Sequence, residues 1–220
     1  MLYQYGYNEH SLRRDLTAYF STHKMSQAQA ALEYAWEKHE GSKRMNGQPY
    51  IIHPLFVAKY SIAIGASSED QVCIGLLHDV CEDCGILPTD LPFNEKVQQS
   101  VARLTFTYDF ASGDSEDKKQ MKKIISKCET FARLIEDPEA LICKGIDRYH
   151  NLITVEELPE ENIVKNVLET HRWLLPVIYS ALSIRAYEKY HAQLYVLSIN
   201  LRSMTDIIAM KHNITLNTMP

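Results

Sequence analysis

The sequence lacks long apolar runs, and it lacks a cationic amino-terminal segment followed by an apolar stretch. A membrane-spanning helix needs about 20 predominantly apolar residues, and a secretory signal needs the cationic start and apolar core. A large positive charge is also missing. The formal net charge of −5 argues against partners that are polyanions, because a net acidic surface does not attract them. These absences predict a cytoplasmic protein that binds neither duplex nucleic acid nor a membrane.

A disulfide pattern is also missing. The five cysteines are scattered at positions 73, 81, 84, 128 and 143, and an odd number of widely spaced cysteines is typical of reduced thiols. Cys81 and Cys84 have C-x-x-C spacing. However, the sequence has neither the strand-to-helix setting of a redox motif nor the second Cys/His pair of a zinc site. We therefore expect small core residues at these two positions.

The alternation of apolar and polar residues that marks β-strands is absent as well. Apolar residues instead recur at helical spacing nearly throughout, without an internal repeat or low-complexity tract. At 220 residues and 45% hydrophobic composition, the chain is long enough for one domain with a substantial core. We predict an all-α fold with an amino-terminal extension at 1–25, a single domain at 26–210 and a loose tail at 211–220.

Helix start and stop signals place the main predicted helices. A helix at 26–38 ends just before a glycine, and a helix at 69–84 starts with a capping box and also ends at a glycine. An Asp-Pro pair starts a helix at 139–153. The stretch 162–210 predicts two further helices, interrupted near Pro176.

The predicted helix 69–84 carries four ionisable side chains on one side. At about 100° per residue, with His78 at zero, Glu82 falls near 40°, Asp79 near 100° and Asp83 near 140°. The cysteines fall on the opposite side. A purely structural helix has little reason to crowd ionisable groups in this way.

Metal-ligand residue types stand at three separated places in the chain. They are His53 at the start of a predicted helix, the pair His78 and Asp79, and Asp147 on the helix 139–153. Two imidazoles and two carboxylates can hold one divalent ion and leave room for a water and a substrate oxygen. The sequence therefore predicts a metal-dependent hydrolase.

Three ordered motifs closely resemble the hydrolase domain of RelA/SpoT-type alarmone enzymes, within the HD superfamily. They are GQPYIIHPLFVA at 47–58, LLHDVCED at 76–83 and KGIDRYHNL at 144–152, and the resemblance runs from about 28 to 176. It implies a multi-helix HD-domain bundle that removes the 3′-pyrophosphate of guanosine tetra- or pentaphosphate, leaving GDP or GTP. Because the chain ends without room for a synthetase or regulatory domain, we expect a small stand-alone alarmone hydrolase. Whether it forms a homo-oligomer is left open.

The resemblance also implies a cofactor and the roles of individual residues. It implies a manganese ion, Mn²⁺, with the ligands His53, His78, Asp79 and Asp147. Glu82 and Asp83, one helical position apart, could position and deprotonate a water, which makes them the predicted catalytic residues.

Four further residues are predicted to bind substrate. The family resemblance places Arg44 where an arginine stacks on the nucleobase, a task that suits a planar guanidinium. Asn151, one turn after Asp147, would orient substrate or solvent. Thr154 would extend the same polar face into the nucleoside pocket, and Lys144 lies one turn before Asp147.

Several alternatives stay open. Met45 stands where the family usually has a basic residue, so the substrate could instead be an adenosine alarmone or the 2′-phosphate of NADPH. The same metal site could serve nucleoside monophosphates, and a catalytically silent alarmone-sensing module is a hypothesis of another class. The stretch 105–117 is a candidate lid or substrate loop. The lysine-rich segment 118–127 is either a solvated helix face or a contact for a phosphorylated substrate.

Overall fold

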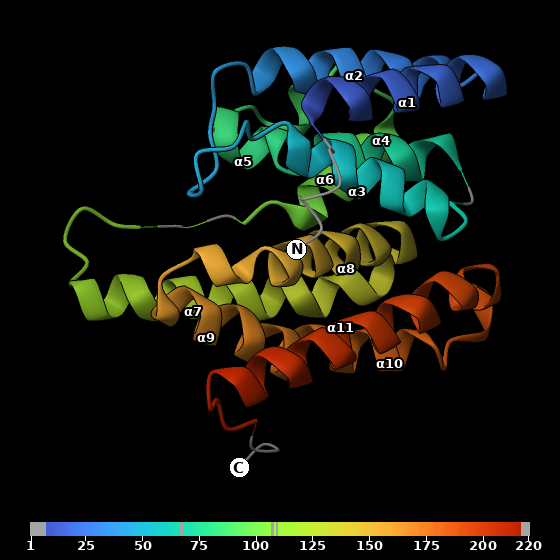
Figure 1. Cartoon of the computed structure of the whole chain (residues 1–220). Helices are drawn as coiled ribbons and strands as arrows, with labels where there is room; N and C mark the ends of the chain where they lie inside the picture. Colours follow the sequence, from blue (N-terminus) through green and yellow to red (C-terminus); the bar gives the residue numbers. More distant parts are fainter. Residues whose placement is uncertain (1–7, 67, 107, 109, 217–220) are drawn as a thin grey trace.

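The computed structural model describes residues 8–66, 68–106, 108 and 110–216, and within these ranges every regular element is helical (Figure 1). The predicted all-α class is confirmed. None of the described helices is both long and apolar enough to cross a bilayer. The α-helices are α1 Glu9–His23, α2 Ser26–Lys38, α3 Ile52–Ala63, α4 Glu69–Leu77, α5 Val80–Cys84, α6 Glu95–Leu104, α7 Glu116–Arg133, α8 Pro138–Ile153, α9 Glu160–Glu169, α10 Leu175–Ala181 and α11 His191–Lys211.

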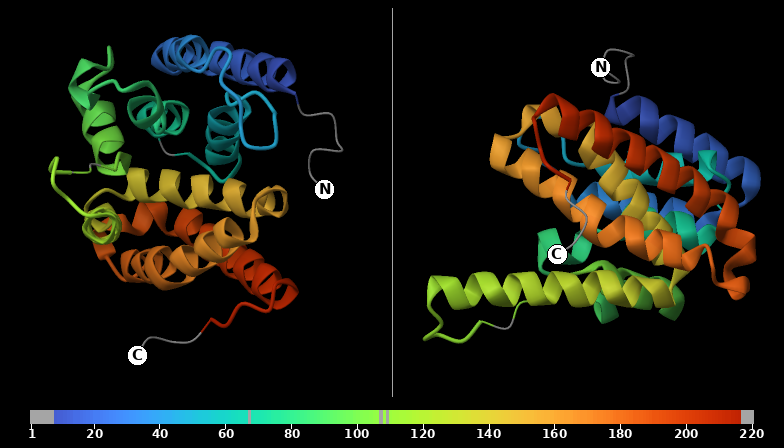
Figure 2. Two further views of the ribbon diagram at one scale, coloured as in Figure 1. Left: turned by 90° about the vertical axis from the view of Figure 1, so that its left-hand side faces the viewer. Right: turned by 90° about the horizontal axis from the view of Figure 1, so that it is seen from below.

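The helices stack in layers around α8. In Figure 1, α1 and α2 cover α3 and α4, α8 lies in the middle, and α9, α10 and α11 lie on its other side. Figure 2 shows the same layers from two further directions. One hydrophobic cluster is formed largely by α1 to α6 and the other largely by α8 to α11. The functional site lies between them, where α3, the turn between α4 and α5, and α8 meet.

Helix α1 lies within the segment predicted to be an amino-terminal extension. Its apolar side is formed by Leu12, Leu16 and Phe20, which are at most 3% exposed and belong to the first cluster. The helix starts at the N-cap Asn8, whose side chain accepts a hydrogen bond from the backbone N–H of Ser11. This part of the segment therefore contributes to the core. Residues 1–7 lie outside the described residues.

The prediction of one continuous helix at 69–84 was wrong. The helix is interrupted at His78 and Asp79, which form a turn between α4 and α5. His78 Nδ1 lies 3.0 Å from the carbonyl oxygen of Gly75, the acceptor that the backbone N–H of Asp79 would use in an unbroken helix. The side chain thus competes for this carbonyl, and the break sets the direction of both metal-ligand candidates.

Helices α3 and α4 cross closely because Gly75 has no side chain. A Cβ atom at this position would lie 3.3 Å from Val57 Cγ1 and 3.4 Å from the backbone of Ala58. An added side chain would crowd Val57. This crossing carries His53 on α3 next to His78 at the end of α4.

The predicted interruption near Pro176 was also wrong. The chain is helical without a break from α9 through a π-helical turn, Thr170–Leu174, into α10. A proline inside an α-helix lacks an N–H and its ring clashes with the carbonyl four residues earlier. The wider π turn just before Pro176 accommodates both defects. The chain leaves the helix only at Leu182 and Ser183.

All five cysteines are free thiols, as expected. Cys73 and Cys81 are buried in the first cluster. Burial raises the pKa of the Cys73 thiol well above its usual range and that of the Cys81 thiol to about 11. Cys84 is half-buried and its thiol lies against the carbonyl of Lys38. The C-x-x-C spacing thus belongs to packing, since the thiols are held in their protonated form.

Part of the predicted carboxyl-terminal tail packs on the domain. His212 Nε2 lies 3.3 Å from a carboxylate oxygen of Glu156, and the N–H of Ile214 donates to the carbonyl of Ala209 at 2.8 Å. Ile214 and Leu216 also contact the second hydrophobic cluster. Residues 217–220 lie outside the described residues.

Candidate metal centre

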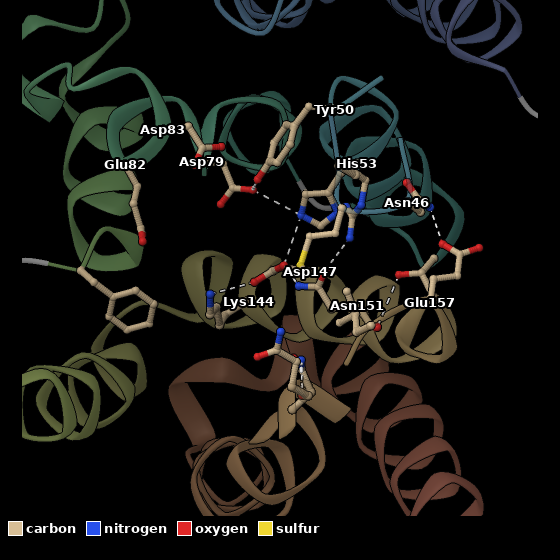
Figure 3. Close-up of a pocket in the computed structure, with 17 residues that line it drawn as sticks. Asn46, Tyr50, His53, Asp79, Glu82, Asp83, Lys144, Asp147, Asn151 and Glu157 are labelled. Carbon is tan, nitrogen blue, oxygen red and sulfur yellow. Dashed lines mark hydrogen bonds and ion pairs between the residues drawn. The ribbon is translucent and has the colours of Figure 1, made fainter. Parts of the chain in front are cut away.

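A pocket of about 370 Å³ opens between α3, α5 and α8 (Figure 3). Its size lies within the range of small-molecule sites, about 300–1,000 Å³. All the predicted site residues line this pocket except His78, which is buried. Residues that are far apart in the sequence are therefore gathered in one place.

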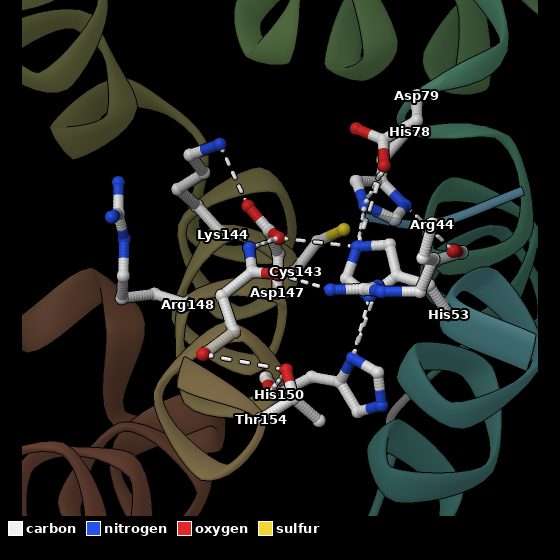
Figure 4. Close-up of polar contacts among 12 residues, drawn as sticks. Arg44, His53, His78, Asp79, Cys143, Lys144, Asp147, Arg148, His150 and Thr154 are labelled. Atoms are coloured by element: carbon white, nitrogen blue, oxygen red, sulfur yellow. Dashed lines mark hydrogen bonds and ion pairs between the residues drawn. The ribbon is translucent and has the colours of Figure 1, made fainter. Parts of the chain in front are cut away.

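The four predicted metal ligands converge at the centre of the pocket (Figure 4). The Nε2 atoms of His53 and His78 lie 3.2 Å apart, and Asp79 Oδ2 lies 3.3 Å and 3.1 Å from them. Asp147 Oδ1 lies 3.2 Å from His53 Nε2. The ligand atoms of the first three residues all lie within 4.8 Å of one another, so a single ion could contact them together.

Both imidazoles are oriented through their other nitrogen atom. His78 Nδ1 donates to the carbonyl of Gly75, which leaves Nε2 facing the pocket as the ligand atom. His53 Nδ1 lies 2.8 Å from His150 Nδ1. Burial and the neighbouring His53 hold the pKa of His150 well below its usual range, so the neutral ring of His150 accepts and His53 donates. The Nε2 atom of His53 is then also available as a ligand.

The two carboxylates are held in their ionised form. Burial alone would raise the pKa of Asp147, but Lys144 and His53 outweigh it and keep this pKa well below the usual range. Lys144 Nζ donates to Oδ2 at 2.7 Å and Asn151 Nδ2 donates to Oδ1 at 2.6 Å. For Asp79, the two imidazoles likewise outweigh burial. Its Oδ2 atom accepts from the hydroxyl of Tyr50 at 2.7 Å.

The charge balance of this cluster fits a divalent cation. Burial disfavours protonation of His78, yet the negative charges of Asp79 and Asp147 outweigh it and raise the pKa of His78 to about 9. The cluster therefore attracts positive charge strongly enough to hold an extra proton on a buried ring. A divalent ion with nitrogen and oxygen ligands would neutralise the same carboxylates.

Glu82 and Asp83 extend from α5 at the mouth of the pocket, beside Asp79 (Figure 3). Partial burial, followed by the charge of Asp79, raises the pKa of Asp83. The pKa of Glu82 is also raised, mainly by burial, although Lys144 acts in the opposite direction. A raised pKa brings a carboxylate closer to the range in which it works as a general base.

The predicted substrate-binding residues form the wall next to the metal centre. Arg44 donates to Asn151 Oδ1 at 2.9 Å, which joins the loop before α3 to α8. Thr154 is the C-cap of α8 and its hydroxyl donates to the carbonyl of His150 at 2.9 Å. Lys144 lies on the opposite side of Asp147 from Asn151 (Figure 3). Their contacts with a ligand stay predictions.

Some residues of the site were missed in the sequence. Tyr50, which holds Asp79, stands three residues before His53 in the same motif, and His150 stands three residues after Asp147. Phe106, Asn46 and Glu157 also line the pocket. No local pattern pointed to these three, because they reach the site from loops and turns.

The lysine-rich segment 118–127 lies on α7, and the described lining of the pocket includes none of its lysines. Lys118 and Lys122 each lie 2.7 Å from a carboxylate oxygen of Asp114. Lys127 pairs with Glu169 at 2.7 Å. In the preceding loop Phe106 lines the pocket, whereas positions 107 and 109 fall outside the described residues. Contact between a lysine of this segment and substrate stays a prediction.

Comparisons with known proteins agree with the geometry. A family model described as "HD domain" matches residues 31–182, a range that includes all four metal-ligand candidates. The chain is 32% identical over 177 residues to guanosine-3′,5′-bis(diphosphate) 3′-pyrophosphohydrolase of Aquifex aeolicus, covering 78% of this chain and 24% of that protein. It is 31% identical over 157 residues to a probable GTP pyrophosphokinase of Mycobacterium leprae, covering 70% of this chain and 19% of that protein.

A third relative is the guanosine-3′,5′-bis(diphosphate) 3′-pyrophosphohydrolase of Spiroplasma citri, 32% identical over 166 residues, with 73% of this chain and 20% of that protein covered. The chain thus spans about a quarter or less of the length of these relatives. The family match covers most of the chain, and the relatives carry the resemblance predicted from the three motifs. The chain therefore belongs to the HD domain family and is homologous to the hydrolase regions of RelA/SpoT-type enzymes.

Proposed function

We propose that this protein is a metal-dependent phosphohydrolase that removes the 3′-pyrophosphate from guanosine tetra- or pentaphosphate and leaves GDP or GTP. The observation that carries the proposal is the convergence of His53, His78, Asp79 and Asp147 in a pocket whose mouth holds Glu82. Two of the relatives named above are 3′-pyrophosphohydrolases of guanosine-3′,5′-bis(diphosphate) by name, which supports the choice of substrate.

The cofactor in this proposal is Mn²⁺, held by the two imidazoles and two carboxylates. When bound, such an ion acidifies a water and neutralises phosphate charge. The hydroxyl of Tyr50 donates to Asp79 and so positions the carboxylate of this proposed ligand. His150 fixes the ring of His53, and partners of this kind typically change metal affinity or activity about 10- to 100-fold when they are lost.

Glu82 and Asp83 are the proposed water-activating pair. Both carboxylates face the pocket, and the raised pKa of each favours proton uptake from a water. Lys144, only 8% exposed, places its ammonium between Asp147 and the interior of the pocket. There it can also face the negative charge of a phosphate group.

The nucleoside is proposed to lie on the other side of Asp147. Arg44 offers its guanidinium plane for stacking on a base, and its hydrogen bond to Asn151 holds that plane at the pocket wall. Asn151 and Thr154 supply hydrogen-bonding groups along the same face of α8.

One observation favours a second candidate substrate. Met45 lines the pocket and is 69% exposed, so an uncharged thioether replaces the basic residue usual in the family at this rim. A weaker cationic clamp would admit adenosine alarmones or the 2′-phosphate of NADPH through the same metal centre.

The test is to incubate the purified protein and Mn²⁺ with guanosine and adenosine alarmones, NADPH and nucleoside monophosphates, and to identify the products. We expect pyrophosphate from guanosine tetraphosphate, and none with Glu82→Gln. Pyrophosphate from adenosine alarmones, or single phosphate from NADPH, would support the second candidate. Metal-dependent nucleotide binding without any product would mean a sensing module and would refute the proposal.

A further inference from the structure

The pocket has a second polar group at the end away from Glu82 and Lys144. There Asn46, from the loop before α3, meets Glu157, from the 3₁₀ turn Val155–Glu157 that follows α8 (Figure 3). The side-chain amide of Asn46 donates to Glu157 Oε2, and both residues line the pocket. We call these two residues the rim pair.

The rim pair lies where the base of a bound nucleotide would reach. The candidate metal ligands occupy the centre of the pocket, and Asn151 follows on the rim-pair side (Figure 3). Arg44 lines the pocket too and donates to Asn151. At the rim, Met45 and Leu158 provide apolar surface that suits the faces of a ring. The polar edge of that ring then meets the rim pair.

The carboxylate of Glu157 is available to a ligand. Among the described contacts its partner is the neutral amide of Asn46, and no Lys, Arg or His side chain forms an ion pair with it. The adjacent Glu156 differs, because it pairs with Lys211 and lies 3.3 Å from His212 Nε2. Glu156 does not belong to the described lining of the pocket.

We propose that the rim pair recognises the hydrogen-bonding edge of guanine, an inference that rests on the function proposed above. A carboxylate only accepts hydrogen bonds, and guanine presents two adjacent donors, N1–H and the N2 amino group, which match the two oxygens of Glu157. The second N–H of the Asn46 amide donates to guanine O6. One base thus satisfies both side chains.

Adenine does not fit the same pair. Its corresponding edge presents an acceptor, N1, beside the N6 amino donor, so the N1 lone pair would face a carboxylate oxygen. Glu157 is exposed at the rim, so the discrimination comes from the repulsion between these lone pairs and from the N1–H donor that adenine lacks. Guanine selectivity thus comes from Glu157, even though Met45 removes a cation from this end of the pocket.

The test measures dissociation constants of GDP, inosine diphosphate and ADP for the full chain with Mn²⁺. We expect GDP to bind about 5- to 150-fold more tightly than ADP, the range for one bidentate base contact, with inosine diphosphate between them because it lacks the N2 amino group. Glu157→Gln presents one donor and one acceptor, which complement adenine, so the GDP preference should fall at least about 5-fold. Glu156→Gln is the matched control and should keep the wild-type ratio.

Thermal melting of both variants checks that each is folded. A wild-type GDP:ADP ratio in folded Glu157→Gln would overturn the rim-pair inference, whatever the enzyme does with alarmones. Pyrophosphate release that persists alongside that unchanged ratio would leave the proposed function standing and the inference refuted. If the ratio collapses as expected but no alarmone is hydrolysed, the inference holds and the proposed function fails.

Discussion

The crossing of α3 and α4 at Gly75 gives a prediction that links packing to the metal centre. In Gly75→Ala the added Cβ would lie 3.3 Å from Val57 Cγ1 and 3.4 Å from the backbone of Ala58. The tight contact is the one with the Val57 methyl, and a β-branched side chain in a helix has one strongly preferred χ1 rotamer, so α3 must give by a few tenths of an ångström. Overpacking of this kind costs about 1–3 kcal/mol, while alanine in a helix interior is favoured over glycine by about 1 kcal/mol. The free energy of unfolding should therefore fall by only about 0–2 kcal/mol.

The effect on the metal should be larger than the effect on stability. His53 and His78 are carried by the two helices that move, and ligand distances in metal sites are held within about 0.2 Å. We expect the affinity for Mn²⁺ to fall about 10- to 100-fold, the range for loss of a supporting contact, as measured by calorimetric titration.

Gly145→Ala is a matched control for this prediction. Its added Cβ would lie 3.0 Å from Leu197 Cδ1, which is a closer approach, but that atom is the end of a flexible side chain on α11. The control should bind Mn²⁺ like the wild type. If Gly75→Ala also binds Mn²⁺ with wild-type affinity, the spacing of α3 and α4 does not set the ligand geometry and the reasoning is wrong.

Three further predictions concern the roles and charges of single residues. Asp79→Ala should lose Mn²⁺ binding and turnover together, whereas Glu82→Gln should keep the metal and lose only turnover; equal loss of metal in both would contradict the division of roles. Because the pKa of Glu82 is raised, this carboxylate should be protonated, and inactive as a base, at a higher pH than an ordinary glutamate of pKa about 4.3. The acid limb of the pH profile of kcat/KM should therefore lie above that value. Glu169 is half-buried and paired with Arg148 and Lys127, whose charges outweigh desolvation and lower its pKa; Glu169→Gln should cost about 1.5–3 kcal/mol of unfolding free energy near pH 7, the range for hydrogen bonds to charged groups. That cost should shrink as the pH falls through the lowered pKa, because the wild-type carboxylate then becomes protonated too, and a pH-independent cost in chemical denaturation would contradict the pairing.

Local signals in the sequence were enough to predict most helix starts. The side chain of Ser68 accepts from the N–H of Gln71 at the start of α4, and Asp137 caps α8 with Pro138 in its first turn. Such caps depend on residues within one turn of each other, so they can be recognised without tertiary information. The candidate metal ligands could likewise be proposed from residue types and short motifs, without tertiary information.

The structure differs from the sequence-based prediction where a side chain or a distant segment determines the backbone conformation. The break at His78 depends on a hydrogen bond from its own ring to Gly75, which competes with the helix. The rim pair joins the loop before α3 to the 3₁₀ turn after α8, and no sequence period relates Asn46 to Glu157. Contacts of this kind depend on the packing of α3 against α8, which is a property of the folded chain.

The most direct test of the central claim is pyrophosphate release from guanosine tetraphosphate by the metal-free protein, before and after addition of Mn²⁺. Metal-dependent chemistry at His53, His78, Asp79 and Asp147 predicts no release in a strong chelator and full release when excess Mn²⁺ is restored. Undiminished release in the presence of the chelator would contradict the claim.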